Sequence, residues 1–379
     1  MQISRTEWAR GGMVMKNTDE LMVTRVISKY RWAMALLFGF VAFGHAQVRS
    51  QDASQAEVYR QWIDQLGDRS FAVREAATRA LQDAGPQMLP LLQEVRQSDD
   101  MEVRYRANHL IRLFREAHVQ QAMDALLPFN ARFDRRPDGS IKGVRLDEST
   151  ITDEALAAIT VFDDLELLDL RHTQITDQSL SVIGQLVHLQ QLNLRATKIT
   201  DTGVARLQPL TKLRSLSFEQ TQVTDASMQY LKAMQQLQTL YLGGSQIFGP
   251  GLAEHLMDLP KLTYLSFENS SVTDQHVSSI VQLKHVETLG LDGTQITDEA
   301  LPQIAKLDSL RTLWLNKTAV TSKRLLEFAP QIRELTNLHL AGIPIEDSEA
   351  AQLQTLLPEC SITGLSTQQK QPADRFPVP

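Results

Sequence analysis

The sequence contains one cysteine, few aromatic residues and no long hydrophobic run. The single cysteine, Cys360, cannot form an internal disulfide bond. Aromatic residues make up 6% of the chain, and the formal net charge is −7 without any Lys/Arg run interleaved with aromatics. This composition argues against a nucleic-acid partner. The apolar run from Ala33 to Phe43 is too short to cross a bilayer as a stable helix.

Short motifs typical of enzymes are also missing. The sequence has no His-Glu-x-x-His, no Gly-x-Ser-x-Gly and no Gly-x-x-x-x-Gly-Lys-Ser/Thr, and its nine histidines do not cluster at metal-ligand spacings. Cys360 is a candidate nucleophile, but its expected place in the last strand favours a buried capping residue. We therefore expect a protein that is not an enzyme and uses no metal or cofactor.

What the sequence does contain is an internal repeat. A Thr/Ser-x-Ile/Val triplet, or a close relative, returns every 24 or 25 residues. Its apolar anchors are Ile151, Ile175, Ile199, Val223, Ile247, Val272, Ile296, Val320 and Ile345. A period of this length predicts a stacked repeat protein and not a globule around one enclosed active site.

The third copy shows the unit most clearly. Residues 189–194 alternate apolar and polar side chains, which predicts a strand, and residues 204–210 have apolar side chains at helical spacing. The pair Thr200-Asp201 lies between the two halves and recurs in most copies. We interpret these pairs as caps of the following helices, in preference to a ladder of metal-binding aspartates.

The pattern Leu189-x-x-Leu192-x-Leu194 resembles the leucine-rich repeat family, in its 24-residue bacterial form and in the repeat arms of F-box-type receptors. The resemblance covers residues 141–363. It implies an α/β solenoid, a leucine-rich repeat horseshoe with a parallel concave sheet. Thr or Ser replaces the family's usual Asn or Cys after the strand, as at Thr197. A hydroxyl at this bend can still satisfy the free backbone groups.

The segments that flank the repeats have other patterns. Residues 1–46 are interpreted as a targeting segment with the form of a signal peptide, because Lys29 and Arg31 precede the apolar run and Gly44-His45-Ala46 follows it. We expect export to the periplasm or the exterior and no stable transmembrane span after cleavage. An uncleaved N-terminal membrane anchor is the alternative, and residues 364–379 are expected to be a disordered tail.

Residues 54–116 resemble a pair of HEAT-like helical repeats. The pattern Asp68, Val73, Arg74, Ala77 and Leu81 returns thirty residues later as Ser98, Val103, Arg104, Ala107 and Ile111. This resemblance implies a small all-α segment ahead of the solenoid. Residues 117–140 are then the junction, which we expect to cap the open apolar end of the first leucine-rich repeat.

Candidate binding residues come from strand positions that point away from the core. Four aromatic or imidazole side chains are expected there on nearby strands: Tyr241, Tyr264, Trp314 and His339. Charged residues in the next column separate by sign along the chain, with Arg171 and Arg195 first and Glu219, Glu268 and Asp292 later. Exposed aromatics are typical binding anchors, and separated charges can orient a partner.

These features predict an exported, non-enzymatic scaffold that binds a protein through its concave face. The alternative is a glycan or cell-wall ligand stacked on Tyr241, Tyr264 and Trp314. A substrate adaptor for a ubiquitin-type ligase has only the F-box-like resemblance in its favour, and a hydrolase would need Cys360 or a site assembled from distant repeats.

Overall fold

The computed structural model describes residues 49–247 and 250–365 of the chain. The targeting segment, the tail beyond Leu365 and Phe248-Gly249 of the fifth repeat lie outside these residues. The chain divides into two compact units at Phe114, within helix α5 (Met101–Leu126). We call residues 49–114 the helical unit and residues 115–365 the repeat arm.

The helical unit is formed by α2 (Arg49–Gln65), α3 (Phe71–Ala84), the 3-10 turn η1 (Pro86–Met88), α4 (Leu89–Val95) and the first part of α5. Its core gathers buried apolar side chains from every one of these elements, among them Leu66, Leu81, Met88, Leu92 and Leu110. The predicted all-α character of this segment is confirmed, and its assignment as HEAT-like remains a prediction.

The repeated arginine of the helical unit makes the same contact twice. Arg74 Nη1 donates to the carbonyl of Asp68 at 2.7 Å, and Arg104 Nη1 donates to the carbonyl of Ser98 at 2.6 Å. In both cases the acceptor lies six residues earlier, in the turn that precedes the helix. The arginine therefore satisfies a turn carbonyl and fixes the start of the helix in each copy.

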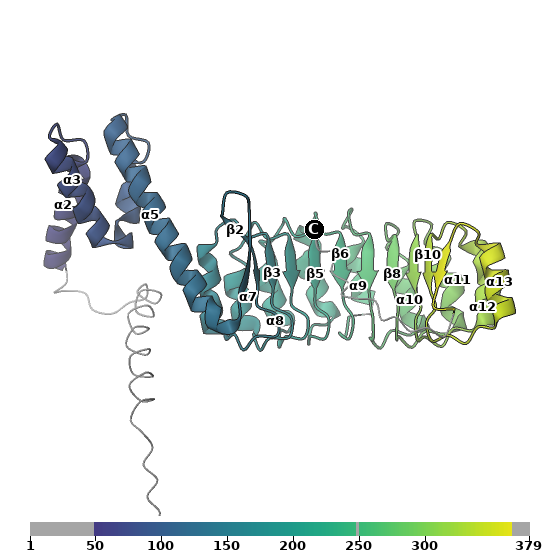
Figure 1. Ribbon diagram of the computed structural model, residues 1–379. Helices are drawn as coiled ribbons and strands as arrows, with labels where there is room; N and C mark the ends of the chain where they lie inside the picture. The colour runs from purple at the N-terminus through teal and green to yellow at the C-terminus, as the bar shows by residue number, and fades with distance from the viewer. Residues whose placement is uncertain (1–48, 248–249, 366–379) are drawn as a thin grey trace, which may run out of the picture. The chain divides into compact units, whose positions relative to one another are not determined.

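The repeat arm contributes one short strand per repeat to a single sheet, seen side by side in Figure 1. The strands follow the chain order and pair in parallel. They are β2 (Ile141–Arg145), β3 (Leu167–Asp169), β4 (Gln191–Asn193), β5 (Ser215–Ser217), β6 (Thr239–Tyr241), β7 (Tyr264–Ser266), β8 (Thr288–Gly290), β9 (Thr312–Trp314), β10 (Asn337–His339) and β11 (Ser361–Thr363).

Helical segments return the chain from each strand to the next. They are α6 (Asp153–Leu156) with η3 (Ala157–Val161), α7 (Asp177–Ile183), α8 (Asp201–Val204) with η4 (Ala205–Leu207), η5 (Asp225–Ala233), α9 (Pro250–Leu256), α10 (Asp274–Ile280), η6 (Asp298–Ala300) with α11 (Leu301–Ile304), α12 (Ser322–Phe328) with η7 (Ala329–Gln331) and α13 (Asp347–Leu356). The strand-then-helix order predicted for the repeat is confirmed.

The core of the arm is a ladder of apolar side chains in register. From β3 to β10 the central residue of each strand is a leucine that aligns with the central residue of its neighbours, as Leu192 does with Leu168 and Leu216. These leucines are almost fully buried. At the start of the arm, Ala122, Leu126 and the strand β1 (Arg132–Arg135), antiparallel to β2, continue this core and sheet.

The far end of the core is closed by α13 and β11. Leu353, Leu357 and Cys360 are buried there, and β11 is the closing strand predicted from this part of the sequence. Burial raises the pKa of the Cys360 thiol, which opposes formation of a nucleophilic thiolate. Cys360 is thus the buried residue expected at this position.

Most bends after a strand use a hydroxyl, as predicted, whereas the bend after β10 has Ile343 at this position and Ser270 Oγ has no partner among the described residues. Thr197 Oγ1 donates to the carbonyl of Leu194 at 2.6 Å, and five other repeats in the described residues make the same bond at 2.5–2.7 Å. The residue before the hydroxyl has a left-handed backbone, with φ of 53° at Ala196. Its N–H donates to the next repeat, Ala196 to the carbonyl of Glu219 at 2.8 Å. These bonds offset the cost of the left-handed residue.

The Thr-Asp pairs do more than cap helices. The threonines accept from the first turn as expected, Thr200 from the N–H of Thr202. The aspartate instead binds the next repeat: Asp177 accepts from the N–H and the hydroxyl of Thr200 at 2.8 and 2.6 Å. Equivalent bonds occur from Asp153, Asp201, Asp274 and Asp298. The pairs therefore join neighbouring repeats.

Removing a central leucine should weaken the whole stack. Leu216 is fully buried between the equivalent leucines of two neighbouring strands. We expect Leu216→Ala to lower the free energy of unfolding by about 2–5 kcal/mol, because a cavity opens in an interior that cannot collapse around it. Urea denaturation followed by circular dichroism measures the change, and a loss below about 0.5 kcal/mol would contradict this packing.

Loss of one Asp-Thr bond should lower the free energy of unfolding by an amount that depends on pH. Burial raises the pKa of Asp153, but the hydrogen bonds from Ser179 and Thr176 outweigh it, so the net pKa is lowered. A lowered pKa in the folded state stabilises the protein at neutral pH, and this contribution disappears as pH falls below about 4. Asp153→Ala should therefore destabilise the arm at pH 7 and progressively less in acid.

The matched control is Asp258→Ala, which removes an exposed carboxylate of the same arm. Denaturation at several pH values should show little effect of this change at any pH. A destabilisation by Asp153→Ala that stays constant from pH 7 to pH 3 would rule out the carboxylate as the bonding form.

Candidate functional site: the sheet face of the arm

The strands expose one face opposite the core. Side chains alternate along a strand, so the residues on either side of each central leucine lie on this face. We call it the sheet face. It also includes the next outward residue after each strand. In the most informative column the aligned residues are Arg145, Asp169, Asn193, Ser217, Tyr241, Ser266, Gly290, Trp314, His339 and Thr363.

The predicted aromatic residues form two pairs on this face. The ring centroids of Tyr241 and Tyr264, on neighbouring strands, lie 5.0 Å apart with the rings tilted by 50°. Trp314 and His339 are also on neighbouring strands and stack almost parallel, 3.6 Å apart at 11°. His339 Nδ1 is 2.7 Å from Thr363 Oγ1, which holds the imidazole in place.

The two pairs differ in exposure. Tyr241 is only 5% exposed, because the ring of Tyr264 packs against it. The expectation that Tyr241 is an exposed anchor is therefore wrong. Tyr264, Trp314 and His339 are half-buried and offer the accessible surface of the two pairs.

Short side chains separate the aromatic pairs. Ser266 and Gly290 occupy the column between Tyr241 and Trp314. A Cβ at Gly290 would lie 2.9 Å from Ser266 Oγ, and one at Gly243 would lie 2.4 Å from the carbonyl oxygen of Glu268. The backbone of the next repeat thus requires a glycine at Gly243, Gly290 packs closely against Ser266, and the sheet between the pairs carries little side-chain volume.

The arginines that were predicted to form a positive end of the face lie close to carboxylates. Arg171 lies 3.4 Å from Asp169 and 3.7 Å from Asp147. Arg195 Nη1 lies 3.7 Å from a carboxylate oxygen of Glu219. The arginines therefore do not form an unopposed positive end, and the expected charge gradient is wrong in this respect. The cause is cross-strand pairing, which brings together residues about one repeat apart.

At the acidic end, the carboxylates have local roles. Asp292 accepts from the backbone N–H and the side-chain amide of Asn316 at 2.9 and 3.1 Å. Glu219 and Asp292 are buried, and Glu268 is half-buried. Of the predicted charged residues, Arg171, Arg195 and Glu268 retain substantial exposure on the face.

Two polar groups on β4 and just after it lack partners within the described residues, and only one of them, Arg195, was singled out from the sequence. Asn193 is 3% exposed, and its Nδ2 has no hydrogen-bond partner among the described residues. The Nε of Arg195 is likewise buried without a partner there. A buried donor without an acceptor costs about 1–3 kcal/mol. The polar groups in this part of the face therefore have fewer hydrogen-bond partners than those of Thr197 and the Asp-Thr pairs.

A cavity of about 390 Å³ opens beside the first strands of the arm. Phe133 and Leu167 supply apolar surface, and Lys142, Gln190 and Gln191 supply polar groups. Its two carboxylates, of Asp134 and Glu166, are paired with Arg145 and Arg136. The cavity depends on how β1 folds beside β2, and no motif in the sequence predicted it.

Comparison with known proteins agrees with this geometry. Residues 185–207 match the family model described as "Leucine Rich repeat". The arm has the fold of a leucine-rich repeat domain. No curated protein that was compared with the sequence matches it significantly.

Solved structures with similarity to the chain include an internalin from Listeria monocytogenes and the plant peptide hormone receptor RGFR1 in complex with RGF2. The internalin is 16% identical, with a TM-score of 0.33, and the match covers 65% of this chain and 95% of the internalin. The receptor is 17% identical, with a TM-score of 0.38, and the match covers 62% of this chain and 40% of the receptor.

Within the described residues, no helix has the length and apolar character needed to cross a membrane. In the same residues, no group of three or more His, Cys, Asp or Glu side chains is arranged to hold a metal ion. The sheet face, with its two aromatic pairs, is the most differentiated surface of the arm.

The buried Asp169 of this face should be tolerant of replacement by asparagine. Burial raises the pKa of Asp169, and the N–H and charge of Arg171 offset this only in part. A raised pKa means that the folded state disfavours the charged form. The charged Asp169 therefore lowers the free energy of unfolding at neutral pH, and protonation in acid removes this cost. The equivalent residue of the next repeat is already Asn193.

We therefore expect Asp169→Asn to leave stability unchanged or to raise it slightly at pH 7, and to have a smaller effect at pH 4. Thermal denaturation at both pH values measures this. A large destabilisation at pH 7 would mean that the ion pair with Arg171 outweighs the cost of burial.

Proposed function

We propose that the leucine-rich repeat domain binds a protein partner through its sheet face and has no catalytic role. The observation that carries this proposal is the pair of aromatic contacts on the face, Tyr241 with Tyr264 and Trp314 with His339. Aromatic residues are enriched at the centres of protein interfaces because they bury a large area with little loss of side-chain entropy.

The spacing of these residues fits a single bound segment. Tyr264 on β7 and Trp314 on β9 are two strands apart, about 10 Å at ordinary strand spacing. The small residues Ser266 and Gly290 lie beside this path, so a partner backbone can approach the sheet between the two anchors. Arg195 and Glu268 are polar groups at the margin for hydrogen bonds and ion pairs.

Rigidity supports this role. The stacked imidazole of His339 fixes the ring of Trp314, and Tyr264 is fixed against Tyr241. Anchors that are already held in one position lose less entropy when a partner binds. The His339 stack also covers one side of Trp314, so no ligand can stack on that side.

Export is the second part of the proposal and rests on the sequence. Lys29 and Arg31 followed by the apolar run to Phe43 and by Gly44-His45-Ala46 have the form of a signal peptide. An exported scaffold would meet partners in the periplasm or outside the cell. N-terminal sequencing of the protein recovered from its native host tests this, since cleavage would place the first residue after Ala46.

The sheet face is tested by Tyr264→Ala/Trp314→Ala/His339→Ala, which removes the accessible anchors and leaves the buried Tyr241 intact. Immobilised wild type and variant are exposed to native envelope and medium fractions, and retained proteins are quantified by mass spectrometry. We expect the variant to retain a partner at least about tenfold less than wild type, because anchor residues dominate interface energetics.

The control is Val187→Ala/Met257→Ala, which removes exposed apolar side chains outside the sheet face. It should retain the partner as wild type does. Equal retention by all three proteins would contradict the proposal. Retention of a polysaccharide, with no protein lost in the anchor variant, would replace the protein partner with a glycan.

A further inference from the structure

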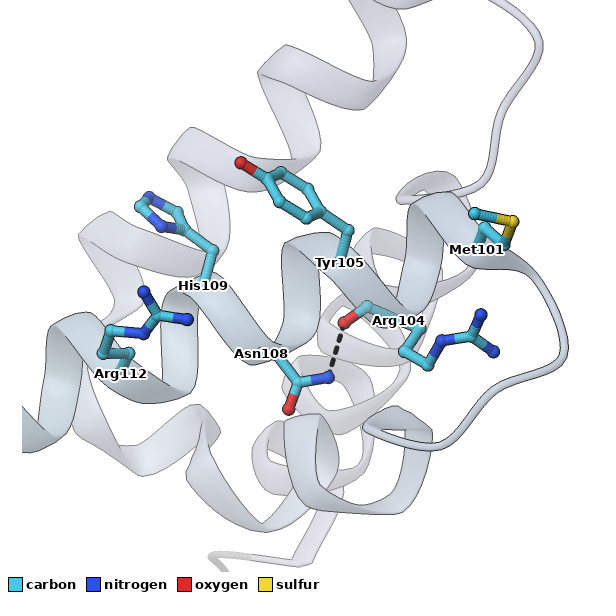
Figure 2. Close-up of a pocket in the computed structure, with 6 residues that line it drawn as sticks. All are labelled: Met101, Arg104, Tyr105, Asn108, His109 and Arg112. Carbon is cyan, nitrogen blue, oxygen red and sulfur yellow. Dashed lines mark hydrogen bonds between the residues drawn. The ribbon is translucent and has the colours of Figure 1, made fainter.

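Helix α5 carries a basic stripe in the helical unit that the proposed function does not use. Figure 2 shows the residues that line a cavity of about 390 Å³ along this helix. In the described part of the chain they are Met101, Arg104, Tyr105, Asn108, His109 and Arg112. Their spacing of three or four residues places them along one side of the helix. We call this set the α5 stripe.

The stripe exposes apolar surface that the core leaves uncovered. Met101 is 74% exposed and Tyr105 is 71% exposed, the two most exposed large hydrophobic side chains of the described residues. Tyr105 and His109 project in the same direction from the helix. Tyr, Met and Arg are the residue types most enriched at protein interfaces. The stripe thus has the composition of a contact surface.

The charge of the stripe is of one sign. Among the described residues that line the cavity, none carries a carboxylate. Three acidic residues lie nearest along the chain: Glu102 binds Arg74 and Arg106, Asp100 accepts from the backbone at the helix start, and Glu116 follows Arg112 by one helical turn, beyond the end of the stripe.

The arginines of the stripe have no carboxylate partner among the described residues. Arg104 donates to a carbonyl, that of Ser98, and Arg112 makes no ion pair there. Arg112 therefore presents its charge and its fork of donors to a ligand, and Arg104 presents its charge and the donors that Ser98 does not use. The stripe is therefore complementary to a carboxylate-bearing surface.

We propose that the α5 stripe docks an acidic segment of a protein partner, with its apolar side chains on Met101 and Tyr105 and its carboxylates on Arg104 and Arg112. The stripe extends over about 16 Å at the rise of an α-helix. That length suits three turns of a partner helix with carboxylates and leucines in alternation.

Two other anionic partners fit less well. A nucleic acid would meet a chain with a formal net charge of −7, which opposes a polyanion. An anionic membrane would need a broad apolar face to insert, and the stripe offers two large apolar side chains. This second surface does not rest on the sheet-face proposal, and either can fail without the other.

The test uses the full chain and a fluorescein-labelled helical peptide of glutamates with leucine at every third or fourth position. Fluorescence anisotropy at low salt measures its affinity for wild type and for Tyr105→Ala/Arg112→Glu. We expect the variant to bind at least about tenfold more weakly, and wild-type binding to weaken as salt is added.

Two matched proteins make the result specific. Arg79→Glu changes an exposed arginine of α3 in the same unit and should bind as wild type does. Arg112→Lys keeps the charge and should retain most of the affinity. Circular dichroism spectra identical to wild type confirm that each variant is folded.

Absence of peptide binding by wild type, or equal binding by Tyr105→Ala/Arg112→Glu, would overturn the proposal. Tighter binding to phosphatidylglycerol vesicles or to a single-stranded oligonucleotide than to the acidic peptide would also overturn it. In either of those cases the stripe would belong to a different class of partner.

Discussion

The structure of the arm depends on the in-register stacking of one strand and one leucine ladder per repeat. No repeat buries its own apolar residues, so each is stable only between two neighbours. The backbone supports this stack directly: the N–H of Ala196 donates to Glu219, and Asp177 binds the N–H and hydroxyl of Thr200. The same few bonds recur along the arm, and they form only when each repeat is aligned with its neighbours.

Stacking constrains most positions of a repeat but not the outward side chains of the strands. The central leucines are needed in the core, and the bends need a hydroxyl and a left-handed residue. Outward strand positions carry neither constraint, and there the chain places Tyr264, Trp314 and His339 beside Ser266 and Gly290. A surface of this kind is rigid because its floor is rigid, which favours recognition through fixed anchors.

Much of the fold was predictable because the signals lie within one repeat. The alternation around Leu192, the hydroxyl at Thr197 and the cap at Thr200 are local patterns, and each was confirmed. Contacts between repeats were harder to predict. Asp177 was assigned to its own helix but binds Thr200, 23 residues away. Tyr241 was expected to be exposed, yet its burial is decided by Tyr264 on the next strand. The predicted charge gradient was wrong for the same reason, because the arginines pair with carboxylates of neighbouring repeats.

Hydrogen exchange of the wild-type protein, followed by mass spectrometry, tests the stacking account most directly. Strand amides that donate to a neighbouring repeat should be protected, and adjacent interior strands from β4 to β8 should open together, with faster exchange toward the terminal strand β11. An interior strand such as β5 that exchanges much faster than both β4 and β6 would show that repeats open singly, which would contradict a stack held by mutual support.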